Sequence, residues 1–278
     1  MDNPPHDNEQ ELPLSRHTFD LHWLRERPHE ANHDDITRSL LDDSPECREL
    51  VRPHLAQAIL DHHIHDRRIA ALVRRLGYDQ AAAFFAAHLP KENNTRKGNF
   101  GEVVASEHLI QRYGYDMPVF KLRFRDSHEL AMRGEDIIAF EMDNGSVARV
   151  IIGEAKCIVR YQKSTVRSAH KRLADAVRPR PMSLSMLSEI LYNEGRDELA
   201  AEIDRVSLEF AQRDFPRQNW IILINQDQPD DPFAFLEEED VDLVAELHCI
   251  GVSLGDLTGL VNHVFDNPVP AQGDDDAA

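Results

Sequence analysis

The sequence predicts an α/β sandwich, and three observations support this prediction. Stretches with apolar residues at spacings of three and four alternate with short apolar runs such as "WIILI" at 220–224. Two strand-like segments flank Asn144-Gly145, which is a strong hairpin signal. From residue 98 onwards the expected order is helix, three strands, helix, and then further strands with helices between them, which is typical of layered α/β proteins.

The composition is that of a soluble globular protein. The chain has 278 residues, 41% hydrophobic and 29% charged, which is enough for one large domain or two smaller ones. We expect no transmembrane helix, and the polar, acidic N-terminus does not resemble a signal peptide. The three cysteines form no CxxC motif, so neither a disulfide framework nor a structural zinc site is expected. A reducing, cytoplasmic location is therefore expected.

The first third of the chain has a helical pattern. Residues 1–13 are polar and proline-rich, and we expect them to be disordered. Between about 34 and 89 the apolar spacing predicts helices in "ITRSLLDD", in "CRELVRPHLAQAILDHHIHDRRIAALVRRLG" up to a stop at Gly77, and in "DQAAAFFAAHL". The polar stretch 90–99 predicts a connection. We therefore expect an N-terminal helical region over 1–90, a second domain over 91–265, and a disordered acidic tail over 266–278.

The second domain is expected to contain strands and helices in turn. A helix over 98–114 closes at Gly114, and "MPVFKLRF" at 117–124 alternates as a strand. "EDIIAFE" and "SVARVIIGEAKC" form the hairpin. A basic helix over 162–177 and two further helices follow. The remaining pattern predicts a buried strand over 219–225, a helix over about 232–246, a strand in "LHCIGVSL" and a last helix in "GDLTGLVNHVF".

Two ionic residues end the apolar strand of the hairpin. Glu154 and Lys156 follow Val150–Ile152 and point to the same face, because side chains alternate along a strand. Ionic groups at such depth are unfavourable unless they are paired or bind a metal. Asp136 and Glu154 lie at equal distances from the turn, so they should be neighbours on adjacent strands. Glu102, in the preceding helix, could complete the cluster.

Clustered carboxylates repel one another unless a cation neutralises them. Hard oxygen ligands suit Mg²⁺ or Mn²⁺, which can polarise a phosphodiester and activate a bound water. Lys156 could orient that water or stabilise charge in the transition state. The alternative is a buried structural ion-pair network, and for Glu102 it is an acid stabilised by the helix dipole.

Other polar residues carry weaker expectations. Glu135 should point to the face opposite Asp136 and be exposed to solvent. "LDHHIHDRR" at 60–68 contains histidines at spacings of three and four, but it is expected to be a polar helix face and not a metal site.

The charge distribution is uneven. A net charge of −19 argues against a protein that coats nucleic acid by bulk electrostatics. From residue 155 to 180, however, there are eight basic residues and only one acid, Asp175. This stretch is either a solvated helix face or a surface that contacts DNA phosphates, with Arg160, Lys163, Arg167, Lys171 and Arg172 as the candidate residues.

The phrases "GNFGE", "RGEDIIAF" and "IIGEAK", in this order, resemble the PD-(D/E)xK nuclease superfamily, although "RGED" lacks the proline of that motif. More narrowly, residues 95–265 resemble the HamA family of the Hachiman anti-phage defence system. The resemblance implies a mixed β-sheet flanked by helices, as in restriction endonucleases. It also implies an Mg²⁺-dependent deoxyribonuclease with Asp136, Glu154 and Glu102 as metal ligands and Lys156 as a catalytic residue.

The same resemblance implies a partner. The nuclease would be restrained by a helicase subunit and released when DNA is damaged or invaded, and residues 1–90 would dock that partner. The alternative function is a non-catalytic subunit whose nuclease-like fold binds DNA or a partner.

Overall fold

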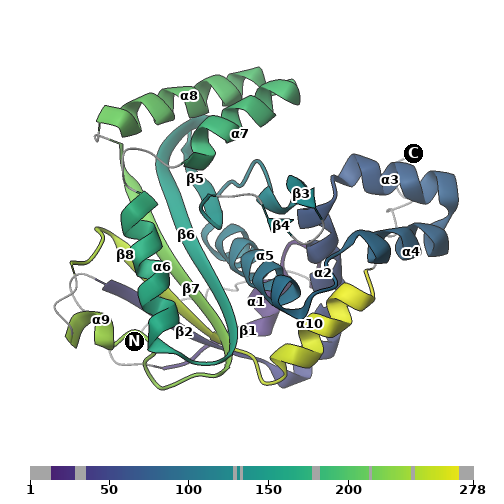
Figure 1. The fold of residues 1–278 in the computed structure, drawn as a ribbon, viewed down its shortest axis with the longest axis horizontal. Helices are drawn as coiled ribbons and strands as arrows, with labels where there is room; N and C mark the ends of the chain where they lie inside the picture. Colours follow the sequence, from purple (N-terminus) through teal and green to yellow (C-terminus); the bar gives the residue numbers. More distant parts are fainter. Residues whose placement is uncertain are drawn as a thin grey trace, which may run out of the picture.

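A six-stranded mixed sheet with the order β1-β2-β8-β7-β6-β5 lies at the centre of the computed structural model (Figure 1). The structure describes residues 14–28, 36–127, 130–131, 134–176, 182–212, 215–238 and 242–268. The strands are β1 (Leu24–Glu26), β2 (Ile36–Asp43), β5 (Ile137–Asp143), β6 (Ser146–Arg160), β7 (Arg217–Asp227) and β8 (Leu247–Ser253). β1 and β5 pair antiparallel with their neighbours, whereas β2, β8, β7 and β6 are parallel. The predicted α/β fold with a mixed sheet is confirmed.

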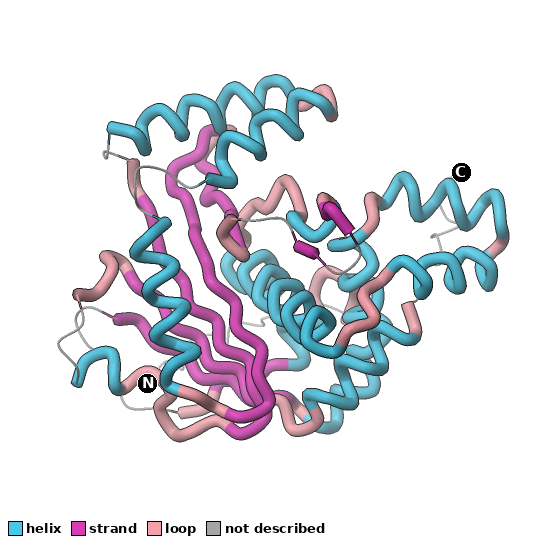
Figure 2. The backbone as a smooth tube through the Cα atoms, in the orientation of Figure 1, coloured by secondary structure: helices cyan, strands magenta, loops and turns pink. Residues whose placement is uncertain are grey.

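Helices cover both faces of this sheet (Figure 2). On one face lie α1 (Phe19–Trp23), α2 (Pro45–His63), α5 (Asn93–Tyr113) and α10 (Leu257–Asp266). On the other lie α6 (Lys163–Ala176), α7 (Met182–Asn193), α8 (Asp197–Gln212) and the short α9 (Phe235–Glu238). Strand β6 contributes side chains to the hydrophobic cores on both faces of the sheet. Ile151 packs on the face covered by α5, and its neighbours Val150 and Ile152 pack on the face covered by α6.

Two smaller units complete the description. Helices α3 (Asp66–Leu76) and α4 (Tyr78–His88) form a hairpin that projects from the body, with a separate small core around Ile69 and Phe85 (Figure 1). The 3₁₀-helix η1 (Lys121–Arg123) leads into the two-stranded β3 (Arg125–Ser127) and β4 (Leu130–Ala131). None of the helices among the described residues is long and apolar enough to cross a membrane.

The predicted hairpin is confirmed in detail. Asn144 and Gly145 have φ values of 49° and 85°, as the twist-compatible two-residue turn requires. The paired strands run back to Ile137 opposite Gly153 despite one irregularity near Glu141. The next position in this register places Asp136 beside Glu154, as the equal distances from the turn predict.

Four predictions of local structure were wrong. "ITRSLLDD" is strand β2 and not a helix; its parallel pairing with β8 places it inside the sheet. Residues 117–124 form no strand, because this stretch runs through η1 after a single bridge between Asp116 and Phe140. Helix α5 begins at Asn93, which shortens the expected connection. Within 232–246 the described residues contain only the short helix α9.

Some expectations remain open. Residues 1–13 and 269–278, which were expected to be disordered, lie outside the described residues. The N-terminal third contributes helices α1 to α4, but it also supplies β1 and β2 to the central sheet. The division at residue 90 stays a prediction.

Candidate active site

The hairpin brings three predicted residues together: Asp136 lies directly before β5, and Glu154 and Lys156 lie in β6. Nζ of Lys156 donates to Asp136 Oδ2 at 3.2 Å, to Glu154 Oε2 at 2.8 Å and to the carbonyl oxygen of Ala155 at 3.1 Å. The backbone N–H of Ala155 also donates to Asp136 Oδ2, at 3.2 Å. Each carboxylate therefore has a fixed position relative to the lysine.

Helix α6 adds a second cation to this cluster. Nε of Arg172 lies 3.2 Å from Glu154 Oε1, and Nη2 lies 3.6 Å from Asp136 Oδ1. Nη2 also donates to the carbonyl oxygen of Gly134 at 3.1 Å. The predicted phosphate-contacting residue Arg172 thus faces the carboxylates in this structure, with its side chain still 48% exposed.

A third cation, Lys121, comes from η1 and was missed by the sequence analysis. Its Nζ lies 3.8 Å from Asp136 Oδ1 and 4.0 Å from Glu102 Oε2, and it donates to the carbonyl oxygen of Glu135 at 2.8 Å. Lys121 therefore joins Glu102 on α5 to the hairpin. The position of Lys121 at the site follows from the path of residues 117–124 in the folded chain. The local pattern "FKLRF" indicates a strand and does not reveal that position.

A pocket opens beside these residues. It is lined by side chains from α2, α5, the segment 117–122, β5 and α7, including His62, Glu102, Ser106, Lys121, Asp136 and Leu187. Glu135 also lines it and is only 8% exposed. The prediction that Glu135 is exposed to solvent was wrong: it lines the same pocket as Asp136, and Lys121 donates to its carbonyl oxygen.

The close approach of α5 to the sheet places Glu102 at this pocket. A Cβ atom on Gly101 would lie 2.7 Å from Cβ of Cys157 on β6. Glycine at this position therefore lets the helix pack directly on the strand that carries Glu154 and Lys156.

Burial and mutual repulsion perturb the acids. Burial, and then the charge of Asp136, raise the pKa of Glu154 to about 7. Burial alone would raise the pKa of Asp136 as well, but Lys156, Lys121 and Arg172 hold it below its ordinary value. Although burial opposes it, the charges of Asp136 and Glu154 raise the pKa of Lys156, which keeps the ammonium protonated.

The two hairpin carboxylates provide part of the oxygen ligands that a hard divalent ion needs. Asp136 and Glu154 present carboxylate oxygens on adjacent strands, and Mg²⁺ is commonly bound by one or two carboxylates plus water. Among the described residues, no group of three or more His, Cys, Asp or Glu side chains is arranged to hold a metal. Glu102 lines the same pocket, and Lys121 Nζ lies between it and Asp136. We therefore regard Asp136 and Glu154 as the candidate ligands.

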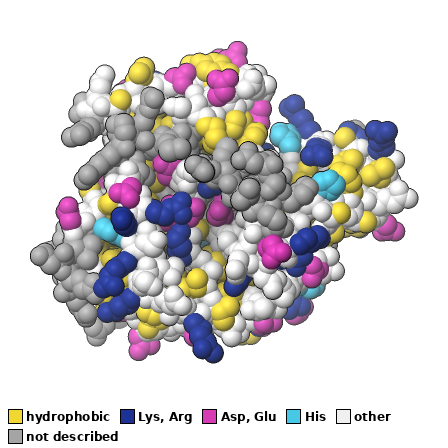
Figure 3. All heavy atoms as spheres, viewed as in Figure 1, with side chains coloured by type: hydrophobic (Ala, Val, Ile, Leu, Met, Phe, Trp, Pro, Cys, Tyr) yellow, Lys and Arg dark blue, Asp and Glu magenta, His cyan; other side chains and the backbone are white. Residues whose placement is uncertain are grey.

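The remaining basic candidates lie along the outer face of α6 and at the end of β6. Arg160, Lys163, Arg167 and Lys171 are exposed. Lys163 and Arg167 also lie over the ring of Phe235 on α9, at 5.2 and 5.4 Å from its centroid. Figure 3 shows dark blue side chains over α6, next to a hollow that contains both acidic and basic groups.

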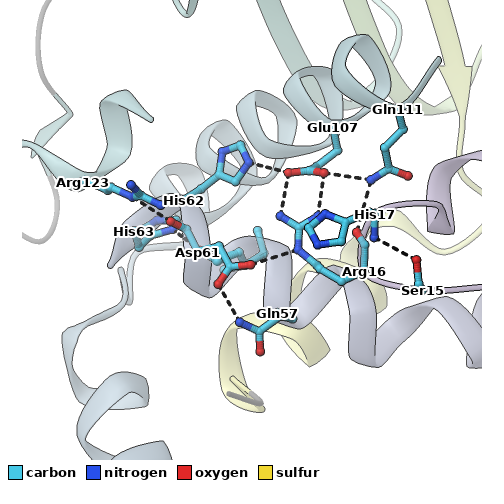
Figure 4. Close-up of polar contacts among 11 residues, drawn as sticks. Ser15, Arg16, His17, Gln57, Asp61, His62, His63, Glu107, Gln111 and Arg123 are labelled. Atoms are coloured by element: carbon cyan, nitrogen blue, oxygen red, sulfur yellow. Dashed lines mark hydrogen bonds and ion pairs between the residues drawn. The ribbon is translucent and has the colours of Figure 1, made fainter. Parts of the chain in front are cut away.

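A buried network on the opposite side of the pocket involves residues that were not predicted (Figure 4). Arg16 forms two hydrogen bonds with Glu107, of 2.6 and 2.8 Å. His62 Nε2 lies 2.7 Å from Glu107 Oε1, and its ring stacks on Phe120 at 3.7 Å. His62 is 2% exposed, so the prediction of a polar helix face was wrong at this residue. The network joins the N-terminal segment, α2 and α5. Through the stacking of His62 on Phe120 it also contacts the residue that precedes Lys121.

The sequence of this chain matches a known protein family. The family model named HamA matches residues 17–267. The chain is also 28% identical to the Hachiman protein HamA of Bacillus cereus over 186 residues, which is 65% of this chain and 66% of that protein. The match thus spans about two thirds of the curated relative. Because the family model covers most of the sequence, the chain belongs to the HamA family of the Hachiman anti-phage defence system.

Proposed function

We propose that this protein is a metal-dependent deoxyribonuclease that acts as the effector of an anti-phage defence complex. The observation that carries the proposal is the convergence of Asp136, Glu154 and Lys156, with Lys156 Nζ held 3.2 and 2.8 Å from the two carboxylates. Two acids and a lysine on adjacent strands suit phosphodiester hydrolysis. They suit neither a serine triad nor zinc ligation.

The residues divide the chemical work. Asp136 and Glu154 would hold Mg²⁺ or Mn²⁺, with Glu102 at the edge of the site; the bound ion would polarise the phosphodiester and acidify a water. Lys156 would orient the attacking water or stabilise negative charge on the phosphate in the transition state. Arg172 and Lys121 would neutralise the same carboxylates in the absence of the ion. Arg160, Lys163, Arg167 and Lys171 would contact DNA phosphates.

A partner is expected from the electrostatics. With a net charge of −19, most of the surface repels DNA, so the basic helix must dominate locally or a partner must deliver the substrate. We propose that the partner is a helicase subunit that restrains the nuclease in the cytoplasm and docks on residues 1–90.

One observation favours a second candidate, a non-catalytic subunit that binds DNA or its partner. Lys156, Arg172 and Lys121 already supply positive charge to both carboxylates. Such a cluster is also what a purely structural ion-pair network would contain.

Plasmid degradation by the protein together with its partner separates the two functions. Wild type should degrade DNA in Mg²⁺ but not in excess chelator. Asp136→Asn should be inactive and still unfold cooperatively, at a lower temperature because Asp136 loses its charge pairs with Lys156, Lys121 and Arg172. Degradation by Asp136→Asn at the wild-type rate, or by wild type in chelator, would rule out the metal-dependent nuclease. A wild-type complex that binds DNA without degrading it would favour the non-catalytic subunit.

A further inference from the structure

Helix α3 carries a stripe of four arginines, and none of them belongs to the sites described above. Arg67, Arg68, Arg74 and Arg75 are all exposed. In an α-helix, residues seven apart lie about two turns apart and on nearly the same face. Arg67 and Arg74 therefore form one row, and Arg68 and Arg75 form the adjacent row. We call these four residues the α3 stripe.

The opposite face of α3 explains why the stripe points outwards. Ile69 is buried, and Leu72 and Val73 pack against the small core shared with α4. The apolar face thus fixes the rotation of the helix and leaves the guanidinium groups on the solvent side. Only Arg68 makes a described side-chain contact within the hairpin, lying 5.9 Å from the centroid of Phe84.

The stripe differs from many of the other arginines of this acidic chain. Among the residues that the structure describes, no carboxylate pairs with any of the four guanidinium groups. Many other arginines form ion pairs with acids; examples are Arg16, Arg27, Arg38, Arg48, Arg52, Arg96, Arg112 and Arg205. In a chain with 50 acids and 31 basic residues, four neighbouring arginines without a carboxylate partner among the described residues form a local positive surface.

The stripe lies on the same face of the molecule as the hollow at the candidate active site (Figure 3). His62, near the end of α2, lines the pocket, and His65 caps the start of α3 by accepting from the N–H of Arg67. In the space-filling view, dark blue side chains lie over α3 on one side of the central hollow and over α6 on the other (Figure 3). A polyanion that crosses the hollow could therefore meet both basic surfaces.

We propose that the α3 stripe binds the sugar–phosphate backbone of DNA outside the cleavage site, as a second contact surface beside α6. Guanidinium groups bind phosphate oxygens in a bidentate manner, and rows of about 10 Å can span more than one phosphate of a strand. This proposal rests on the proposed function, since it assumes that DNA reaches the pocket. It adds the path of the DNA on one side of that pocket.

Fluorescence anisotropy with a labelled DNA duplex tests the stripe in chelator, so that no cleavage occurs. The variants are Arg74→Gln/Arg75→Gln, the quadruple Gln variant, and Arg167→Gln/Lys171→Gln on α6. Arg52→Gln/Arg205→Gln is the matched control, because it changes the net charge equally at arginines that are paired with acids. Melting temperatures confirm that each variant is folded.

The expected result is weaker binding and a flatter dependence of log K on log salt. At about 0.9 per lost phosphate contact, the slope should fall by roughly 2 in the α3 double variant and roughly 4 in the quadruple variant. Arg→Lys at the four positions should keep most of the slope. The control should bind like wild type.

The outcomes separate the two proposals. DNA binding that depends on α6 but not on α3 overturns the stripe and leaves the proposed function intact. An equal loss in the control also overturns the stripe, because the effect would then be one of net charge. If wild type does not bind DNA at low salt, both the stripe and direct DNA contact by α6 are wrong.

Discussion

Gly101 on α5 faces Cys157 on β6 so closely that an added Cβ would lie 2.7 Å from Cβ of Cys157. This contact sets the distance between the helix that carries Glu102 and the strand that carries Glu154. The second glycine of "GNFGE" thus holds Glu102 close to the strand that carries Glu154 and Lys156.

Gly101→Ala should therefore destabilise the fold. The new methyl group must push α5 away from β6, and overpacking of this kind costs about 1–3 kcal/mol. Gly98→Ala is the matched control, because it lies in the same helix with no atom within 4 Å of the added Cβ. The control should gain up to about 1 kcal/mol from helix propensity. Urea unfolding of both variants measures these free-energy changes. Equal stability of the two variants would show that α5 and β6 can accommodate the extra methyl group without strain.

The sequence predicted Asp136, Glu154 and Lys156 correctly as neighbours because the information is local. A turn signal at Asn144-Gly145 fixes the register, and side-chain alternation fixes the face. The sequence did not predict that Lys121 and Arg172 lie beside the carboxylates, because both positions depend on how a distant segment crosses the sheet. β2 was mistaken for a helix for a similar reason: Ile36, Leu40 and Leu41 match helical spacing, and only pairing with β8 shows that they belong to a strand.

The buried pair of Arg16 and Glu107 should make stability depend on pH. Burial alone would raise the pKa of Glu107, but hydrogen bonds from His62 and the charge of Arg16 hold it far below the ordinary value of 4.5. The unfolded chain therefore binds a proton at Glu107 below about pH 4.5, where the native state does not. By linkage this contribution to stability is complete above that pH and is lost as the pH falls towards the native pKa.

Glu107→Gln tests this contribution. At pH 7 it removes one of the two carboxylates that pair with the buried Arg16, while Asp61 stays 3.0 Å from Arg16 Nε. The cost should therefore be at most the about 3–5 kcal/mol of a fully broken buried pair. Below pH 4.5 the variant should lose stability less steeply than wild type. Unfolding free energies from urea titrations between pH 3 and 7 compare the two slopes. Parallel curves would mean that Glu107 titrates alike in the folded and unfolded chain.

Metal binding should require both hairpin acids. Titration calorimetry with Mn²⁺ should show binding by wild type and its loss in Asp136→Ala, because Glu154 alone, paired with Lys156 and Arg172, leaves too little negative charge to hold the ion. Glu141→Ala is a suitable control: it removes a half-exposed acid from the same strand. Equal binding by wild type and Asp136→Ala would return the cluster to a structural ion-pair network.

Arg172 should compete with the metal. Its guanidinium contacts Glu154 and Asp136 at 3.2 and 3.6 Å, so Arg172→Gln removes a positive charge that would otherwise repel the ion. Mn²⁺ should bind more tightly to this variant, whereas Lys171→Gln, the exposed neighbour on α6, should bind it like wild type. A weaker affinity in Arg172→Gln would show that the guanidinium helps to hold the carboxylates in place for the ion.

The last prediction concerns Lys156, which we expect to act in chemistry and not in folding. Its side chain is 19% exposed. Arg172 and Lys121 still offset the carboxylates when the ammonium is removed. Lys156→Ala should therefore keep its fold and bind Mn²⁺ at least as tightly as wild type. Cleavage should fall on the order of a hundredfold or more, because the lost interaction is formed mainly with the attacking water and the transition state.

Two measurements on the partner-bound protein decide the role of Lys156. A thermal melt in Mg²⁺ reports folding, and a plasmid-degradation assay reports cleavage. Lys156→Arg keeps the charge but changes its shape, so it should melt like wild type and recover little activity if the ammonium must reach a water. A well-folded Lys156→Ala complex that degrades DNA at the wild-type rate would instead make Lys156 a structural partner of Glu154.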